Sequence, residues 1–428
     1  MKAIMKKLLQ KILAYYSKKI LLKYKPRVIG ITGSIGKTST KEAVFAVVKT
    51  KFRARQNIKN YNNEIGVPLT VIGAETGGRS IGGWWRVWRQ AIKLLTSTDD
   101  NYPEILVLEM GADKPGDIEY LVDVASCDIG VVTKVAPAHV EFFGSIEEIA
   151  KEKKKIVTHI DKDGFAVLNF DDNRVKNMAK QVKAKVVSYG FAPEAAVRAI
   201  ELTSQGQGIN LSGLQFKLSY GGSSVPVSIP GVIGGHQIYA ALAAAAVGVC
   251  LGLNILEISD GLKNYQAPKG RMRLLPGING SLLVDDTYNS SPEAAKAAVE
   301  AVGKIETVGS RVAVLGDMLE LGEISNEEHQ NLGREIAVNG FDVLAAVGKY
   351  RQEIIKGAKA SGFGGLILDF EQSDGVSEEL VHGLKSGDVV LVKGSQGSRM
   401  EKVVRGLLAD PSRASEWLVR QDGKWLKN

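Results

Sequence analysis

A glycine-rich turn that ends in lysine and threonine is the first set of residues in this chain with the types and spacing for chemistry. Residues 32–38 read TGSIGKT, between an apolar run that predicts a buried strand and a polar run that predicts a helix. Backbone N–H groups in such a turn, together with the helix dipole, bind phosphate oxygens. Lys37 is expected to reach the terminal phosphates, and the Thr38 hydroxyl to bind Mg²⁺. Ile31 stands where the strict pattern has glycine, so a β–α turn with a chance Gly-Lys-Thr stays open as the alternative.

Polar residues near the ends of later apolar runs are the next candidates. Glu109 lies at the end of the predicted strand Glu104–Met110. A carboxylate at the carboxyl end of a strand, in a fold with a phosphate-binding loop, is where Mg²⁺ is held. His139 follows the predicted strand Asp128–Val135. Its spacing alone leaves a metal ligand and a structural histidine both open.

Two further stretches carry polar groups without a clear choice among them. Asn62 and Asn63 lie in a predicted loop over residues 60–68, and amide side chains that both donate and accept hydrogen bonds suit a nucleotide or a substrate. The predicted helix Glu147–Ile156 carries four lysines, and composition alone cannot choose between them. These are Lys151, Lys153, Lys154 and Lys155.

The elements that must position these residues alternate between strands and helices. A strand is predicted over Phe165–Asn169, a β-rich region with glycine turns over residues 185–232, and an alanine-rich helix over Ala240–Cys250. A linker is predicted over Gly261–Lys269, followed by a strand at Leu282–Asp286. The last region alternates strands with helices, as a small doubly wound α/β domain does. Its predicted strands are Val312–Gly316, Val343–Gly348 and Val389–Gly394.

Length and composition set the class of protein. A chain of 428 residues with 44% hydrophobic and 24% charged residues is typical of a globular protein with two or three domains. Its two cysteines, Cys127 and Cys250, lack ligand spacing and are expected to be buried free thiols in a reducing cytoplasm. No long uncharged apolar run predicts a transmembrane helix.

The net charge of +8 is concentrated at the N-terminus, where no acidic residue precedes Glu42. Eight lysines there equal the whole excess, so the rest of the chain is near neutral, which argues against a nucleic-acid-binding protein. Residues 1–24 predict a basic amphipathic helix with Ile4, Leu8, Ile12 and Tyr15 on one side. This helix either lies on a membrane surface or packs on its own domain.

A second segment, residues 76–100, places Trp84, Trp88 and Ile92 on one helix face, with basic residues between them. Buried aromatic packing is one interpretation of this face. A second patch at the membrane interface, centred on Trp84–Trp88, is the other.

Taken in order, these landmarks resemble the Mur ligases, the ATP-dependent amide ligases of peptidoglycan synthesis, and most closely the MurF type. In the first half the resemblance rests on TGSIGKTSTKE from Thr32, NNEIGVPLT from Asn62, EMGA from Glu109, PAHVEFFGS from Pro137 and AVLNFDD from Ala166. In the second half it rests on GRM from Gly270, DDTYNSSP from Asp285, VLGDMLELGE from Val314 and DVVLVKGSQGSRMEKVV from Asp388. Together these motifs cover nearly everything after Lys25.

The resemblance implies an α/β fold with a central P-loop ATPase domain on a mostly parallel sheet and a C-terminal Rossmann-like domain. The expected divisions are a basic helix over residues 1–26, the ATP-binding domain over 27–268 and the C-terminal domain over 269–428. The implied reaction joins D-Ala-D-Ala to a muramoyl tripeptide through an acyl phosphate, in the cytoplasm or peripherally at the inner face of the membrane. ATP and two Mg²⁺ ions are the implied cofactors.

The resemblance also assigns roles to single residues. Lys37, His139, Lys153 and Arg271 would be catalytic, with Lys153 as the family's carbamylated lysine and Arg271 on the γ-phosphate. Metal ligands would be Thr38, Glu109, His139 and Lys153. The nucleotide would contact Gly33, Ser34, Ile35, Gly36, Lys37, Thr38, Ser39, Asn169, His236, Arg271 and Asp286. Substrate contacts would come from Asn62, Asn63, Tyr288, Asn289, Asp317, Lys393, Ser395 and Arg399.

Three departures from the family pattern bear on the substrates. MurF-type members carry an N-terminal domain that grips the UDP-sugar, whereas here only residues 1–26 precede the P-loop. His236-Gln237 and Ala240 replace the usual His-Asn-x-x-Asn near adenine, and Gln396 replaces an arginine. Two alternatives therefore stay open: a ligase acting on a lipid-linked or other non-UDP acceptor at the membrane, and a non-catalytic ATP-binding partner of cell-wall synthesis.

Overall fold

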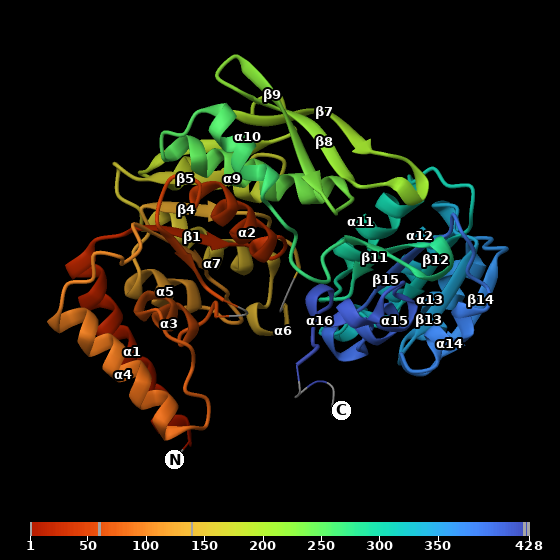
Figure 1. Ribbon diagram of the computed structural model, residues 1–428, viewed down its shortest axis with the longest axis horizontal. Helices are drawn as coiled ribbons and strands as arrows, with labels where there is room; N and C mark the ends of the chain where they lie inside the picture. Colours follow the sequence, from red (N-terminus) through yellow and green to blue (C-terminus); the bar gives the residue numbers. More distant parts are fainter. Residues whose placement is uncertain (1, 59–60, 138–139, 423–424, 426–428) are drawn as a thin grey trace. The chain divides into compact units, whose positions relative to one another are not determined.

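The computed structural model describes residues 2–58, 61–137, 140–422 and 425. The chain forms two compact units. The first comprises residues 1–200, 217–227 and 239–265, and the second comprises residues 201–216, 228–238 and 266–428. Figure 1 shows the elements of each unit in chain order, from red to blue.

The centre of the first unit is a parallel sheet in which the strand that leads into the P-loop is central. β1 (Arg27–Thr32) pairs in parallel with β3 (Ile105–Glu109) on one side and β4 (Ile129–Val132) on the other. β2 (Ala54–Gln56) extends the sheet beyond β3, and β5 (Phe165–Asn169) and β6 (Lys185–Gly190) extend it beyond β4. Because these strands run in parallel, their carboxyl ends, with Thr32, Glu109 and Asn169, meet at one edge.

Helices cover both faces of this sheet. α2 (Lys37–Val48) packs on β1, β2 and β3, with α10 (Ile255–Lys263) behind it. α7 (Ile146–Thr158) packs on β1 and β4, with α5 (Asp117–Val124) beside it, while α3 (Gly66–Ile72) packs on β3. Figure 1 places α2 and α10 on one side of β1 and β4, and α3, α5 and α7 on the other. The core strands are almost wholly apolar, as expected for a sheet buried on both faces.

The N-terminal helix α1 (Lys2–Tyr24) packs on the first unit through a face other than the apolar side noted in the sequence. Leu13, Ser17 and Ile20 are fully buried, and the Ser17 hydroxyl donates to the carbonyl of Pro68 at 3.3 Å. The predicted apolar side points away from the core, since Ile4 is 74% exposed, and Leu8 and Tyr15 are each 58% exposed. The predicted helix is confirmed and packs on its own unit, and the buried face is not the apolar side noted in the sequence.

The tryptophan-rich segment forms α4 (Ile81–Thr96), which lies beside α1 (Figure 1). Its buried residues are Val87, Ala91 and Leu94. Trp84 and Trp88 are half-buried against the core, and Trp88 lies 5.8 Å from the Tyr16 ring of α1. Ile92, predicted to share their face, is 47% exposed. No described helix of the protein combines the length and apolarity that crossing a bilayer requires.

The rest of this half consists of two short helices, the strands of the predicted β-rich region and the helix after them. α6 (Val140–Phe143) and α8 (Asn173–Met178) are short, and α9 (Ile238–Cys250) is the predicted alanine-rich helix. The strands β7 (Val197–Gln205), β8 (Gly213–Tyr220) and β9 (Ser223–Pro230) follow β6 in the same sheet. The predicted linker Gly261–Lys269 was wrong at its start, because α10 continues to Lys263. A capping box of Asn254 and Glu257 begins that helix.

The second unit has a six-stranded sheet in the order β10-β11-β15-β12-β13-β14. All pairs are parallel except β10 (Arg273–Pro276), which runs antiparallel to β11 (Leu282–Asp286) at one edge. The other strands are β12 (Arg311–Leu315), β13 (Val343–Val347), β14 (Leu366–Phe370) and β15 (Val389–Lys393). Helices of this unit are α11 (Pro292–Gly303), α12 (Ser325–Val338), α13 (Arg351–Ala360), α14 (Val376–Val381), α15 (Glu401–Leu407) and α16 (Ala414–Trp417).

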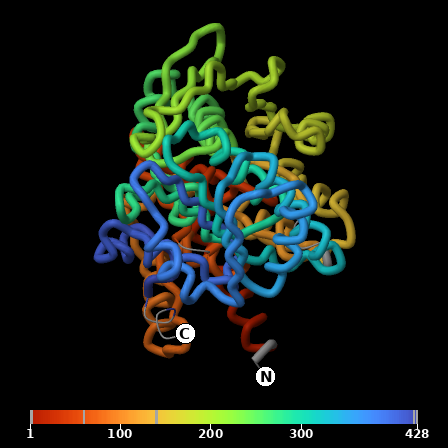
Figure 2. The backbone as a smooth tube through the Cα atoms, turned by 90° about the vertical axis from the view of Figure 1, so that its right-hand side faces the viewer, coloured from red at the N-terminus to blue at the C-terminus, as the bar shows by residue number. Residues whose placement is uncertain are grey.

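The predicted α/β class with mostly parallel sheets is confirmed. Figure 2 gives the same chain turned by 90°, with α4 and α1 at the lower end of the first unit. Sequence patterns missed three strands: β2, β10 and β14. Each lies at or near an edge of its sheet and lacks a long apolar run. The domain limits 27–268 and 269–428 stay a prediction.

The packing of α1 predicts effects of very different size for two leucines of the same helix. Leu13→Ala should lower the free energy of unfolding by about 2–5 kcal/mol, because it leaves a cavity in the core. Leu8→Ala should change it by less than about 0.5 kcal/mol, because the side chain is 58% exposed. Urea unfolding followed by circular dichroism measures both. Equal effects of the two substitutions would contradict this assignment of the buried face.

Candidate active site

The glycine-rich turn between β1 and α2 is held by the loop that follows β4. The Ser34 N–H donates to the carbonyl of Lys134 at 2.6 Å, and the Ser34 hydroxyl donates to the carbonyl of Ala136 at 2.8 Å. The Thr133 hydroxyl contacts the carbonyl of Ile35 at 2.6 Å. A Cβ on Gly33 would lie 1.9 Å from the Thr133 hydroxyl oxygen, so only glycine permits this approach. The turn is therefore fixed by its neighbours before any ligand arrives.

Lys37 begins α2, and its side chain folds back over the turn. Its Nζ donates to the carbonyls of Gly33 at 2.8 Å and Ser34 at 3.2 Å. Gly36, the residue before it, has a left-handed φ of 86°, which glycine adopts at little cost. The ammonium is therefore placed over the mouth of the turn, at the N-terminus of a helix, where anions bind.

Glu109 ends β3 beside this turn and is nearly buried, at 5% exposure. The Asn62 amide donates to Glu109 Oε1 at 2.9 Å, which orients the carboxylate. Asn57 holds the backbone, since its amide donates to the carbonyl of Glu109 and its oxygen accepts the Glu109 N–H, both at 2.9 Å. The Asn-rich loop therefore positions Glu109, while Asn63 caps the start of α3 instead.

The four lysines of α7 differ sharply in their surroundings. Lys153 is 4% exposed and lines the same pocket as Lys37. Lys151 is exposed and pairs with Glu148, and Lys154 donates to Gln181 at the surface. Lys155 pairs with Glu119 and Glu152 outside the pocket. Of the four lysines, Lys153 is therefore the one whose side chain is buried and lines the pocket.

The pKa of Lys153 is lowered to about 7. Burial is the main cause, because a charged amine loses its hydration there, and the positive charge of Lys37 lowers the pKa further. The carboxylates of Glu152 and Asp113 act in the opposite direction but do not compensate. A substantial fraction of Lys153 is therefore a neutral amine, and hence a nucleophile, near neutral pH.

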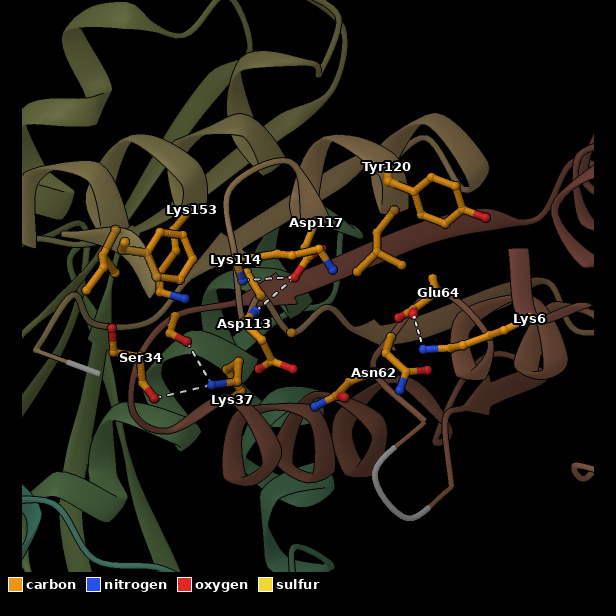
Figure 3. A pocket seen from close by; sticks show the side chains of 17 residues that line it. Lys6, Ser34, Lys37, Asn62, Glu64, Asp113, Lys114, Asp117, Tyr120 and Lys153 are labelled. Carbon is orange, nitrogen blue, oxygen red and sulfur yellow. Dashed lines mark hydrogen bonds and ion pairs between the residues drawn. The ribbon is translucent and has the colours of Figure 1, made fainter. Parts of the chain in front are cut away.

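Lys37 and Lys153 lie at one end of a pocket of about 350 Å³ within the first unit. Figure 3 shows both amines near Ser34, with Asp113, Lys114, Asp117 and Asn62 toward the middle. Lys6 of α1 and Glu64 lie at the other end and form an ion pair of 3.0 Å. The pocket therefore extends from the P-loop to a second end that carries charged side chains of both signs.

Sequence reasoning missed two parts of this pocket. The loop Asp113–Asp117 follows β3, and the Asp117 carboxylate accepts the N–H groups of Asp113 and Lys114 at 3.0 Å. The Asp-Lys-Pro-Gly-Asp run at the carboxyl end of a strand was a turn signal that could have identified it. Lys6 had no such signal, because only the packing of α1 brings it to the pocket.

Some predicted residues of the first unit hold the protein's own structure. Asn169 is buried, and its amide donates to the carbonyl of Thr133 at 2.9 Å. Thr38 is half-buried and Ser39 is buried on α2, next to Lys37. His139 lies outside the described residues. Among the residues that are described, no group of three or more His, Cys, Asp or Glu side chains could hold a metal ion.

The predicted residues of the second unit gather near the carboxyl ends of β11, β12 and β15. Asp286 accepts from Lys393 Nζ at 2.5 Å and from the Met272 N–H at 3.2 Å. The Arg271 guanidinium lies 4.1 Å from the centre of the Tyr288 ring. Lys393 also donates to the carbonyl of Asn289 at 3.1 Å, and both Asp286 and Lys393 are buried.

The other predicted residues of this unit are also engaged locally. Asp317 accepts the N–H groups of Lys349 and Tyr350, and the Ser395 hydroxyl accepts the Leu319 N–H. Arg399 donates to Glu401 at 2.7 Å. His236 lies in a short 3₁₀ helix, Gly235–Gln237. Their assignments as nucleotide or substrate contacts stay predictions.

Comparison with known proteins identifies the family to which this chain belongs. The Mur ligase middle domain matches residues 90–248, and the Mur ligase glutamate ligase domain matches residues 270–396. The UDP-N-acetylmuramoyl-tripeptide–D-alanyl-D-alanine ligase of Escherichia coli is 32% identical over 381 residues, covering 89% of this chain and 76% of that protein. The chain belongs to the Mur ligase family. The ligase of the same name from Bacillus subtilis is 29% identical over 385 residues, covering 90% of this chain and 76% of that protein.

Solved structures agree with this Mur ligase assignment. MurF from Acinetobacter baumannii has a TM-score of 0.76 at 26% identity, covering 92% of this chain and 79% of that chain. MurF from Thermotoga maritima, solved in complex with ADP, has a TM-score of 0.74 at 28% identity, covering 95% of this chain and 84% of that chain. The resemblance to MurF-type ligases expected from the sequence is confirmed.

The buried amine of Lys153 predicts a specific pH dependence of stability. In the unfolded chain a lysine has a pKa of about 10.4, and the folded value here is about 7. Between these values the unfolded state binds more protons, so the free energy of unfolding rises with pH. Lys153→Met removes this cost. The variant should therefore gain stability over the wild type most at pH 7 and below, with the gain vanishing toward pH 10.

The measurement is urea unfolding at several pH values in CO₂-free buffer. Lys151→Met is the matched control, because Lys151 is exposed on the same helix, and its difference from the wild type should not vary with pH. A pH-independent difference for Lys153→Met would show that this amine is not the perturbed group.

Proposed function

We infer that this Mur ligase is an ATP-dependent amide ligase of peptidoglycan precursor synthesis, of the MurF type. It joins D-Ala-D-Ala to the free carboxylate of a muramoyl tripeptide and releases ADP and phosphate. The observation that carries this inference is the pairing of the P-loop amine of Lys37 with the buried amine of Lys153 in one pocket. The relatives named above carry the same activity in their names.

The chemistry explains why a cationic group lies at the P-loop end of this pocket. A carboxylate is a poor acyl donor, so it first attacks the γ-phosphorus of ATP, and the bond from that phosphorus to the ADP oxygen breaks. The resulting acyl phosphate is attacked at its carbonyl carbon by the amine of the dipeptide, and phosphate leaves as the amide forms. Both steps concentrate negative charge, which the P-loop N–H groups and Lys37 would stabilise.

The residues of the first unit fit the binding of Mg²⁺. Thr38 and Glu109 supply a hydroxyl and an oriented carboxylate, the hard oxygen ligands that Mg²⁺ prefers. A carbamate on Lys153 would supply a second anionic oxygen group, with His139 as its expected companion. Bound Mg²⁺ would neutralise charge on the transferred phosphoryl group. Asn62 orients the Glu109 carboxylate, and Lys153 lies in the pocket wall.

Carbamylation of Lys153 fits its surroundings. A neutral amine attacks the carbon of CO₂ and loses a proton, which leaves an anionic carbamate. The lowered pKa supplies the neutral amine near pH 7, and the carbamate would place an anion near the positive charge of Lys37. The second, C-terminal unit is expected to contribute Arg271 to the γ-phosphate and Asp286 to the ribose. The ligation would take place in the cytoplasm, where ATP is supplied.

The ligase reaction is tested directly with the full chain, ATP, Mg²⁺ and D-Ala-D-Ala. ADP release should require both the dipeptide and a muramoyl-tripeptide acceptor, and mass spectrometry should detect the pentapeptide product. Lys37→Ala should lower turnover by at least about 100-fold, because the phosphate charge loses its stabilising cation. Lys49→Ala, at the other end of α2, is the matched control and should stay active.

Parallel reactions with UDP-linked and lipid-linked tripeptide identify the form of the acceptor. The MurF-type assignment expects turnover with the UDP-linked form. Turnover with the lipid-linked form alone would favour a non-UDP acceptor. ATP binding without amide formation on either acceptor would overturn the ligase assignment and favour a non-catalytic partner.

The role of Lys153 has its own test. Lys153→Ala should lose most ligase activity, since the carbamate oxygens are lost, and added acetate should restore part of it by supplying a carboxylate in the space left by the side chain. Lys151→Ala, Lys154→Ala and Lys155→Ala should stay active, because these side chains point away from the pocket. In ¹³CO₂-equilibrated wild type, NMR should detect a carbamate that is missing from Lys153→Ala. Full activity of Lys153→Ala would refute this role.

A further inference from the structure

The exposed sides of α1 and α4 form one continuous surface that nothing in the ligase reaction uses. We name it the α1–α4 face, defined by its apolar residues Ile4, Leu8, Tyr15 and Leu22 on α1 and Ile81, Trp85 and Ile92 on α4. All seven side chains are between 47% and 89% exposed. With 3.6 residues per turn, the apolar residues of each helix fall within a sector of about 40°.

The two helices touch through aromatic side chains. Tyr16 of α1 and Trp88 of α4 form this contact, with ring centres 5.8 Å apart, and Trp84 stacks on Trp88 at 6.1 Å. At about 100° per residue, Trp88 lies about 20° from the exposed sector of α4 and Tyr16 lies about 80° from that of α1, and both sectors lie on the side of their helix away from its buried residues. Tyr15 packs edge-on against Tyr16 at 5.7 Å. The exposed apolar side chains therefore flank a single aromatic seam.

The charged residues of the two helices themselves are all basic. α1 contains seven lysines and α4 contains Arg86, Arg89 and Lys93, and neither helix contains an aspartate or glutamate. Lys6 and Lys18 are paired with Glu64 and Asp123 of the neighbouring elements. Lys11 on α1, and Arg86, Arg89 and Lys93 on α4, flank the apolar sectors and are exposed.

We propose that the α1–α4 face binds the surface of a membrane that contains anionic lipid. An apolar strip with tyrosine and tryptophan along it and basic side chains at its edges matches the boundary between acyl chains and anionic headgroups. Both helices would lie in the plane of the membrane, with Ile81, Trp85 and Leu8 inserted below the headgroups. The side of α1 that packs on the protein, with Leu13 and Ile20, is separate from this face, so binding needs no unfolding.

Charge complementarity also disfavours a second copy of the chain as the occupant. In a symmetric dimer the same patch meets itself, so the basic edges of one face would oppose those of the other. Like charges placed opposite one another destabilise an interface. An anionic surface satisfies both features of the face at once, the apolar strip and its basic edges.

The proposal is tested by sedimentation of the full chain with phosphatidylcholine vesicles and with vesicles that contain phosphatidylglycerol as well. The wild type should bind the anionic vesicles, and binding should weaken as salt is raised. Leu8→Glu/Trp85→Glu should raise the apparent Kd at least about 10-fold, as should Arg86→Gln/Arg89→Gln/Lys93→Gln. The matched control is Leu256→Glu, a leucine of α10 that is 63% exposed and should leave binding unchanged.

Two further measurements make the outcome decisive. Brominated lipids should quench fluorescence of the wild type more than that of Trp85→Phe, which reports insertion of that side chain. ATP turnover of the variants should match the wild type, which separates this surface from the ligase site. Failure of the wild type to bind anionic vesicles, or equal binding by Leu8→Glu/Trp85→Glu, would overturn the proposal. So would a concentration-dependent dimer, seen by ultracentrifugation, that the same substitutions abolish without vesicle binding.

Discussion

Two amines that face one polar pocket impose the main electrostatic constraint on this protein. Lys37 reaches the pocket from the P-loop, and Lys153 reaches it from the middle of α7. Burial of an amine is costly, and a neighbouring positive charge raises the cost further. The carboxylates of Glu152 and Asp113 offset this cost only in part, since the pKa of Lys153 stays lowered to about 7. Under the proposed function, ATP phosphates beside Lys37 and a carbamate on Lys153 would both supply negative charge to these amines.

The parallel sheet holds the two amines in place because it fixes the loops that surround the pocket. β1, β3 and β4 end at one edge, and short side chains there bind backbone groups of the neighbouring loop. Thr133 and Ser34 link the P-loop to the loop after β4. That loop is held in turn by the Asp172 carboxylate, which accepts the Val135 N–H at 2.8 Å. Asn57 and Asn62 do the same for Glu109. Small polar residues thus form the hydrogen bonds that fix the loops, and the charged side chains remain directed at the pocket.

Sequence patterns predicted the parts of this arrangement that depend on local signals. The strands at Arg27–Thr32 and Phe165–Asn169 are buried on both faces and read as short apolar runs, and the P-loop follows a known chemical pattern. The side on which α1 packs could not be predicted, because the helix has apolar residues on two sides. Leu13 and Ile20 face the core, while Leu8 and Tyr15 face outward. Only the position of α3 and α4 decides between them.

Spacing and composition alone do not show which residues tertiary packing brings together, and only the family resemblance singled out Lys153. Composition could not separate Lys153 from its three neighbours, whereas the packing of α7 on β1 and β4 leaves this one amine in the pocket. β14 was missed because its residues are half-exposed at a sheet edge and lack a continuous apolar pattern.

The second unit shows how a buried ion pair positions a loop that carries a charged group. Asp286 binds Lys393 and also accepts the N–H of Met272, whose left-handed φ of 53° is unusual for a residue with a side chain. Arg271 precedes Met272, and its guanidinium stacks on Tyr288, two residues after Asp286. The carboxylate of Asp286 therefore stabilises the backbone turn that directs Arg271. Any role of Asp286 toward the ribose would be added to this structural one, and loss of its charge would affect Arg271 through the backbone as well.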